Sequence, residues 1–163
     1  MHHPWHILGA GAIGSLFAHA FRAAKVPVSL LVRTNQPTPR ALRIVRGGQT
    51  LRAEVPVCSA LDAPPIERLL VCTKAYDVAT ALRSVRHRLT SDSVCVVLVN
   101  GMGLSDVAAQ VCPPGTRIFA GTTTEGAYRL QDDDGSSRTV HAGSGTTLIG
   151  VSGGGGRGGE SVH

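Results

Sequence analysis

The chain has 163 residues, 42% of them hydrophobic and 17% charged, a balance typical of one globular domain rather than a disordered chain. No segment approaches the roughly 18 apolar residues of a membrane-spanning helix, and the N-terminus lacks the basic region of a signal peptide. The net charge of +5 comes from 14 Arg and 2 Lys, scattered without interleaved aromatic residues, which argues against nucleic-acid binding. The four cysteines form no C-x-x-C pair, so we expect reduced structural cysteines, no metal site and a cytoplasmic protein.

The N-terminal segment has the order strand, glycine turn, helix, strand. Apolar residues 5–8 predict a short strand, and Ala-rich residues 12–24 predict a helix that ends before Pro27, because proline cannot continue it. The continuous β-rich run 28–32 is typical of a parallel strand that is covered on both faces. The glycine turn at 9–14 therefore stands where a backbone can hold a pyrophosphate.

The middle of the chain continues this alternation, with a proline-containing loop at 35–40 and a hairpin around Gly47 and Gly48. We expect strands at 42–45, 51–57, 69–72, 94–99 and 117–121, and helices at 75–89 and 104–111. Alternation of strands and helices predicts an α/β fold with a doubly wound, mostly parallel, Rossmann-like sheet.

Threonine-rich runs change the pattern after residue 121. We expect segments 122–128, 138–141 and 146–151 to form antiparallel strands that close the edge of this sheet. The glycine-rich segment 152–163 cannot bury enough apolar area to offset its ordering entropy, and we expect a flexible tail there. The predicted domain is therefore 1–151.

The turn Gly9-Ala10-Gly11-Ala12-Ile13-Gly14 matches the pattern G-x-G-x-x-G. In this pattern the first glycine permits the tight turn, the second lets the backbone approach a pyrophosphate, and the third lets the helix pack closely on the strand. Helix N–H groups and the helix dipole add attraction for phosphate. Such a turn can also occur without a ligand, but its place between a strand and a helix favours dinucleotide binding.

Arg33 follows the second predicted strand, nineteen residues after Gly14. An acidic residue near this position bonds the ribose 2′-hydroxyl of NAD, whereas an arginine accommodates the 2′-phosphate of NADP. A guanidinium can also stack on adenine while it bonds phosphate. The alternative is a surface arginine at a strand end; the motif context favours NADP(H).

Polar residues follow three further predicted strands at the carboxyl edge, where open α/β sheets bind ligands. Lys74 brings an ammonium group to this edge, and Asn100 brings both a donor and an acceptor beside Gly101 and Gly103. The third such segment is 121–129. A solvated lysine at a helix start and a simple Asn-Gly turn are the alternatives for the first two.

Taken in order, these segments resemble the ketopantoate reductase (2-dehydropantoate 2-reductase) family. The resemblance runs from residue 5 to about 151. The matching stretches are Gly9 to Gly14, Leu-Leu-Val-Arg33, Leu-Leu-Val-Cys-Thr-Lys74-Ala-Tyr, Asn100-Gly-Met-Gly103, Gly121-Thr-Thr-Thr-Glu-Gly-Ala127 and His141-Ala-Gly-Ser-Gly145 with Ile149-Gly150.

The resemblance implies a role for each matched position. The loop 9–14 would bind the pyrophosphate, Arg33 the 2′-phosphate, and the Ala127 backbone the nicotinamide side. Asn100 and Lys74 would serve both cofactor and catalysis. In this family NADPH transfers a hydride to the ketone of ketopantoate and yields pantoate for pantothenate and coenzyme A synthesis.

The chain departs from the family at its C-terminal end. The family has a second, helical domain that carries the general-acid lysine, whereas Lys74 is the last lysine here. General acid catalysis contributes about 10²–10⁴-fold, so we expect weak or absent turnover from these residues alone. An exposed interdomain face would favour self-association. A non-catalytic NADP(H)-binding module, or the partner of a separate helical chain, is the alternative function; a product that hardly folds is a third possibility.

Overall fold

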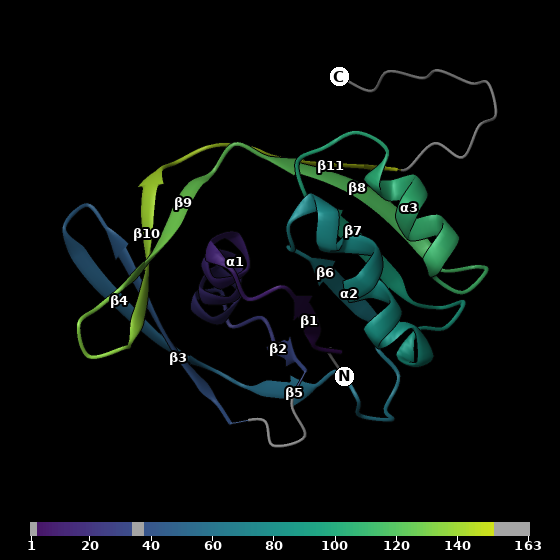
Figure 1. Cartoon of the computed structure of the whole chain (residues 1–163), viewed down its shortest axis with the longest axis horizontal. Helices are drawn as coiled ribbons and strands as arrows, with labels where there is room; N and C mark the ends of the chain where they lie inside the picture. The colour runs from purple at the N-terminus through teal and green to yellow at the C-terminus, as the bar shows by residue number, and fades with distance from the viewer. Residues whose placement is uncertain (1–2, 34–37, 152–163) are drawn as a thin grey trace.

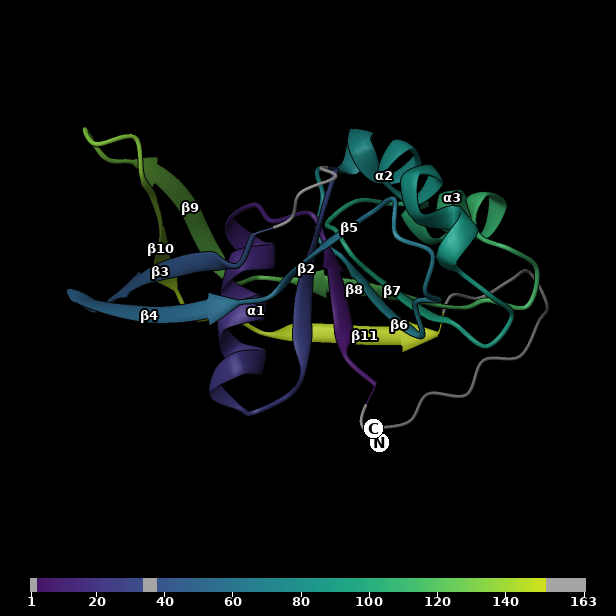
Figure 2. The same ribbon diagram turned by 90° about the horizontal axis from the view of Figure 1, so that it is seen from below.

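The computed structural model describes residues 3–33 and 38–151. A seven-stranded and a four-stranded sheet enclose helix α1 (Ala12–Ala23), and helices α2 (Val78–Val85) and α3 (Leu104–Val111) cover the other face of the larger sheet (Figure 1). Figure 2 shows the same layers after a 90° turn: the smaller sheet and α1 lie on one side of the larger sheet, and α2 and α3 lie on the other. Residues 35–37 of the predicted loop at 35–40 and the whole predicted tail at 152–163 lie outside the described residues.

The larger sheet has the strand order β11-β8-β7-β6-β1-β2-β5, and all neighbours are parallel except β11 and β8, which are antiparallel. Its strands are β1 (Trp5–Leu8), β2 (Val28–Val32), β5 (Val57–Ser59), β6 (Arg68–Val71), β7 (Val94–Leu98), β8 (Arg117–Thr123) and β11 (Thr147–Val151). The predicted class, a doubly wound and mostly parallel sheet with an antiparallel edge, is confirmed.

Two apolar layers explain why these strands read as continuous hydrophobic runs. One layer packs Ile7, Leu30 and Leu70 against the α1 side, and the other packs Leu69 and Val97 against α2 and α3. Successive strand residues face opposite sides, so a strand buried on both faces needs apolar residues at every position.

The smaller sheet was not predicted. It has the order β4-β3-β10-β9, formed by β3 (Arg40–Arg46), β4 (Gln49–Val55), β9 (Gly126–Gln131) and β10 (Ser137–Gly143). The expectation that segments 122–128 and 138–141 close the edge of the main sheet is therefore wrong, and β11 alone does so. Strands β9 and β10 instead join the β3–β4 hairpin and cover α1, because its outer face is apolar as well.

Several predicted boundaries shift for local reasons. The helix expected at 75–89 is α2 flanked by two 3₁₀ turns, Ala75–Asp77 and Arg86–Arg88. Buried Arg88 donates from Nε to the Pro64 carbonyl and from Nη1 to the Ser59 carbonyl, both at 2.8 Å, and so ties down the second turn. The strand expected at 51–57 breaks at Pro56, which carries the chain from β4 to β5.

Candidate functional site

A cleft of about 440 Å³ lies at the carboxyl ends of β1, β6, β7 and β8. The chain runs from β1 to β2 and β5 on one side and then crosses to β6 on the other, so this edge is the topological switch point at which α/β sheets bind ligands. The cleft is lined by Gly9, Gly11, Ala12, Ile13, Cys72, Thr73, Lys74, Ala75, Asp77, Leu98, Val99, Asn100, Thr123 and Ala127.

The three glycines of the turn differ in whether a side chain would fit at their position. Gly9 has φ +105°, and a Cβ there would lie 2.7 Å from the Cys72 carbonyl carbon. A Cβ on Gly14 would lie 1.9 Å from the Gly9 oxygen, so the fold itself requires glycine at both positions. Gly11 has an ordinary φ of −77°, and a Cβ there would meet no atom within 4 Å. Nothing in the described protein requires glycine at Gly11, and its open side faces the cleft.

The N-terminus of α1 opens onto this space without a cap of its own. No side chain caps the helix at Gly11 among the described residues, and its first turn contains no acidic residue. The first-turn N–H groups of a helix have no intrahelical partners, and the helix dipole favours an anion near them. The turn therefore offers backbone donors and room for a phosphate group.

The end of β6 supplies the cation of the cleft. Lys74 is exposed and caps the 3₁₀ turn that follows, because its carbonyl accepts a hydrogen bond of 3.0 Å from the Asp77 N–H. Its neighbour Cys72 is buried, and burial raises the pKa of this thiol to about 12. Cys72 therefore stays protonated at neutral pH and supplies no thiolate nucleophile to the cleft.

Asn100 ties the end of β7 to the end of β8. Its Oδ1 accepts hydrogen bonds from the Thr122 hydroxyl (2.8 Å) and the Thr123 N–H (3.1 Å), and its Nδ2 donates to the Thr123 carbonyl (3.0 Å). An amide nitrogen carries two hydrogens, so one remains beyond these bonds. Asn100 is thus held in place by β8 and still retains one donor at the cleft.

A hydrogen-bonded chain connects the smaller sheet to Asn100. We call Arg46, His141, Glu125 and Thr123 the bridging network. Arg46 Nε donates to His141 Nδ1 (2.7 Å), and His141 Nε2 lies 2.6 Å from Glu125 Oε2. The Glu125 N–H donates to Thr123 Oγ1 (3.2 Å), and Thr123 is the residue bound by Asn100.

The hydrogen bond from Arg46 to Nδ1 fixes the tautomer of the His141 imidazole. Since Nδ1 accepts from Arg46, the proton of neutral His141 is on Nε2 and is donated to the Glu125 carboxylate. This hydrogen bond holds the pKa of Glu125 below its usual value. The His141 side chain is only 2% exposed, so the network joins β3, β10 and the β8–β9 connection inside the protein.

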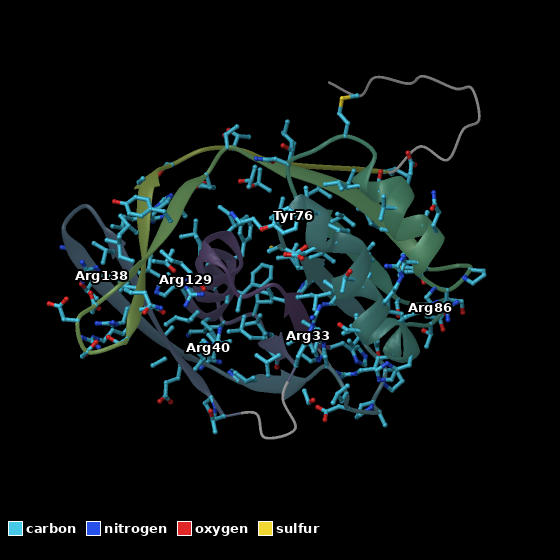
Figure 3. The ribbon with its side chains drawn as sticks, in the orientation of Figure 1. Arg33, Arg40, Tyr76, Arg86, Arg129 and Arg138 are labelled. Atoms are coloured by element: carbon cyan, nitrogen blue, oxygen red, sulfur yellow. The ribbon has the colours of Figure 1, made fainter. Side chains whose placement is uncertain are left out.

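The structure brings most of the predicted site residues together, namely Gly9, Gly11, Ala12, Ile13, Lys74, Asn100 and Ala127. Gly14 lies buried behind the turn, and the Ala10 carbonyl accepts a hydrogen bond of 3.2 Å from Arg129. Arg33 is exposed just beyond β2 and does not line the cleft (Figure 3).

Sequence reasoning missed the bridging network and Arg129. Thr123 and Glu125 fall within the segment flagged at 121–129, but no role was predicted for either. His141 belongs to a stretch that matched the family, and nothing in the sequence indicated its bonding partners. The described residues contain no cluster of three His, Cys, Asp or Glu that could bind a metal, and no described helix is long and apolar enough to cross a membrane.

Solved structures with the same architecture include two oxidoreductases of low sequence identity to this chain. The ternary structure of D-mandelate dehydrogenase with NADH and anilino(oxo)acetate superposes with a TM-score of 0.73 at 21% identity, over 90% of this chain and 47% of that one. A PanE/ApbA family ketopantoate reductase from Ralstonia eutropha JMP134 gives 0.72 at 20% identity, over 90% and 48%. At these identities the likeness establishes the fold.

Sequence comparison is more specific. The 2-dehydropantoate 2-reductase of Halobacterium salinarum is 33% identical over 152 residues, which cover 88% of this chain and 48% of the relative. That of Pyrococcus abyssi is 31% identical over 149 residues, covering 90% and 47%. The chain thus spans about half the length of these curated relatives. The model of the family described as ketopantoate reductase PanE/ApbA matches residues 5–154, and the chain therefore belongs to this oxidoreductase family.

Proposed function

We propose that residues 1–151 are a dinucleotide-binding domain that takes NADP(H) in the cleft. The observation that carries this proposal is the open side of Gly11 at the uncapped start of α1: the fold demands Gly9 and Gly14, whereas Gly11 lines the cleft and leaves room for a pyrophosphate to approach the backbone. The uncapped first turn of α1 supplies N–H donors for the pyrophosphate beside it. Ala127 and Asn100, at the other end of the cleft, contact the nicotinamide side.

Arg33 binds the 2′-phosphate in this proposal. The residue is exposed directly after β2, where a guanidinium can reach a group on the adenosine ribose. We expect Arg33→Ala to weaken NADPH binding about 10–100-fold, because hydrogen bonds to charged groups contribute about 1.5–3 kcal/mol. NADH lacks the 2′-phosphate, so its affinity should stay within about twofold. Parallel titrations of both nucleotides measure this; an unchanged preference for NADPH would remove the role from Arg33.

The substrate proposed is ketopantoate, as in the named relatives. When bound, NADPH supplies the hydride for reduction of the ketone. The fixed Asn100 donates its remaining amide hydrogen toward the substrate oxygen, and Lys74 brings positive charge to the same edge. Gly9, Gly11 and the start of α1 hold the cofactor at the floor of the cleft.

The substrate assignment is tested by following NADPH absorbance with ketopantoate present. Lys74 is the one lysine or arginine that lines the described cleft, and the cleft is open to water. We therefore expect the 163 residues alone to oxidise NADPH slowly, at a ketopantoate-dependent rate above the no-enzyme rate. This rate should fall further in Asn100→Ala. Tight NADPH binding with no ketopantoate-dependent oxidation would favour a non-catalytic NADP(H)-binding module. Rapid turnover that survives Asn100→Ala would contradict the assigned role.

A further inference from the structure

A second hollow, of about 650 Å³, lies between the first turns of α1 and the smaller sheet and shares no lining residue with the cleft. We call it the arginine hollow. Its polar lining consists of Ser15, Arg40, Arg43, Arg52, Arg129, Gln131, Asp134, Ser136, Ser137 and Thr139. Four guanidinium groups thus face one carboxylate in a space larger than a single phosphate requires.

Strand register creates this hollow. Strands β3 and β10 pair only at Thr139 with Ile44 and at Val140 with Val45. Beyond that point the strands separate, and the first half of β3 has a paired neighbour on the β4 side alone. The Arg43 side chain crosses the gap to Asp132 (2.6 Å) and Ser136 (2.5 Å) in the β9–β10 hairpin. The opening is therefore built into the sheet.

Positive charge in the hollow exceeds what the protein neutralises. Arg43 and Arg52 are directly opposite on β3 and β4, an arrangement of like charges that is unfavourable by itself. Asp132 compensates Arg43 but also pairs with Arg138. The side chains of Arg40 and Arg52 make no hydrogen bond or ion pair with any described residue. Asp134, the lining carboxylate, is engaged by the Ser136 backbone N–H (2.9 Å).

Strand alternation places Arg40 and Arg129 on the α1-facing side of the smaller sheet and Arg43 and Arg52 on its other side, and all four line the hollow because it opens where β3 and β10 separate. Figure 3 shows Arg40 and Arg129 on the side of the smaller sheet that faces α1, with Arg138 farther out. Arg129 is already oriented by Ser137 Oγ (2.7 Å) and the Ala10 carbonyl. Guanidinium groups match the oxygens of phosphoryl groups in a bidentate manner, and serine and threonine hydroxyls complete such sites.

We propose that the arginine hollow is a second anion site, which binds a small, multiply charged phosphoryl compound through Arg40, Arg52 and Arg129. A single carboxylate would leave most of this charge uncompensated, whereas a diphosphate carries enough oxygens and charge to engage several guanidinium groups. The site is independent of the dinucleotide cleft, since no residue lines both.

Calorimetric titration with inorganic pyrophosphate tests the proposal on three variants of the whole chain. Arg40→Gln/Arg52→Gln removes two charges from the hollow and spares Arg129, which contacts the glycine turn. Arg22→Gln/Arg83→Gln is the matched control, because both residues are exposed on α1 and α2, outside the hollow. Gly11→Val fills the open side of the glycine turn without an internal clash and excludes anion binding there.

Both arginine pairs are therefore also made on the Gly11→Val background. We expect pyrophosphate binding to persist in Gly11→Val, to weaken at least about tenfold when Arg40→Gln/Arg52→Gln is added to it, and to change by less than about twofold when the control pair is added instead. If both double arginine variants lost the same affinity for pyrophosphate, the loss would reflect the lower net charge of the protein, and the proposal would be overturned. Complete loss in Gly11→Val would assign the anion to the glycine turn and also overturn it. Absence of pyrophosphate binding in every variant would do the same. NADPH binding by Arg40→Gln/Arg52→Gln reports separately on the proposed function.

Discussion

Gly14→Ala is expected to destabilise the domain and abolish dinucleotide binding together. The new Cβ would lie 1.9 Å from the Gly9 carbonyl oxygen, a backbone atom at the tightest point of the turn, so α1 or the turn must move. Forced overpacking of this kind costs about 1–3 kcal/mol, and a domain of this size loses about 2–4 °C in Tm for each kcal/mol. Thermal unfolding should therefore occur up to about 10 °C lower, and NADPH should no longer shift it.

The matched control is Gly11→Ala, the same chemical change three residues earlier. Its Cβ meets no protein atom within 4 Å, so the Tm of the free chain should stay within about 2 °C of wild type. NADPH affinity should nevertheless fall at least about tenfold, because the methyl group occupies space used by the pyrophosphate. If Gly11→Ala binds NADPH normally, the open side of Gly11 has no part in cofactor binding.

Removal of the His141 imidazole from the bridging network should lower the stability of the protein. In His141→Ala both Arg46 and Glu125 lose a hydrogen-bond partner, and a buried space is left. Hydrogen bonds to charged groups contribute about 1.5–3 kcal/mol each, so we expect a loss of about 3 kcal/mol in the free energy of unfolding. Denaturant unfolding measures this loss, and His141→Gln, which can keep one of the two bonds, should lose less.

The same variant tests whether the network positions the nicotinamide end of the cleft. The network reaches Thr123, Asn100 and the start of β9, which carries Ala127. We expect His141→Ala to weaken NADPH several-fold while 2′-phospho-ADP-ribose, which lacks nicotinamide, binds as in wild type. Equal losses for both ligands would indicate general destabilisation instead of a positioning role.

The parallel core was predictable because its signal is local. Runs such as 28–32 and 94–98 are almost entirely apolar, with Ser29 the one polar residue, as is typical of strands covered on both faces, and the glycine turn stands between a strand and a helix. These features predict which edge of the sheet holds the carboxyl ends of the strands. Lys74, Asn100 and the glycine turn lie together at that edge. A site at strand ends therefore follows once the strands are parallel.

The smaller sheet was not predictable in the same way. Segments 126–131 and 137–143 have one partly exposed face, and a pattern of that kind predicts a strand without naming its neighbour. The second segment pairs with β3, which lies about 90 residues earlier in the chain, so no local signal records the pairing at Val140 and Val45. The bridging network and the arginine hollow both depend on this long-range pairing, which is why neither emerged from the sequence.

The proposed binding of NADP(H) at the switch point of the parallel sheet can be measured on the chain itself. Calorimetric titration of NADPH into the folded 163-residue chain tests it most directly. We expect saturable binding of one nucleotide per chain, tighter for NADPH than for NADH and lost on Gly14→Ala. A chain that is folded by circular dichroism but releases no binding heat, and shows no rise in Tm with saturating NADPH, would contradict it.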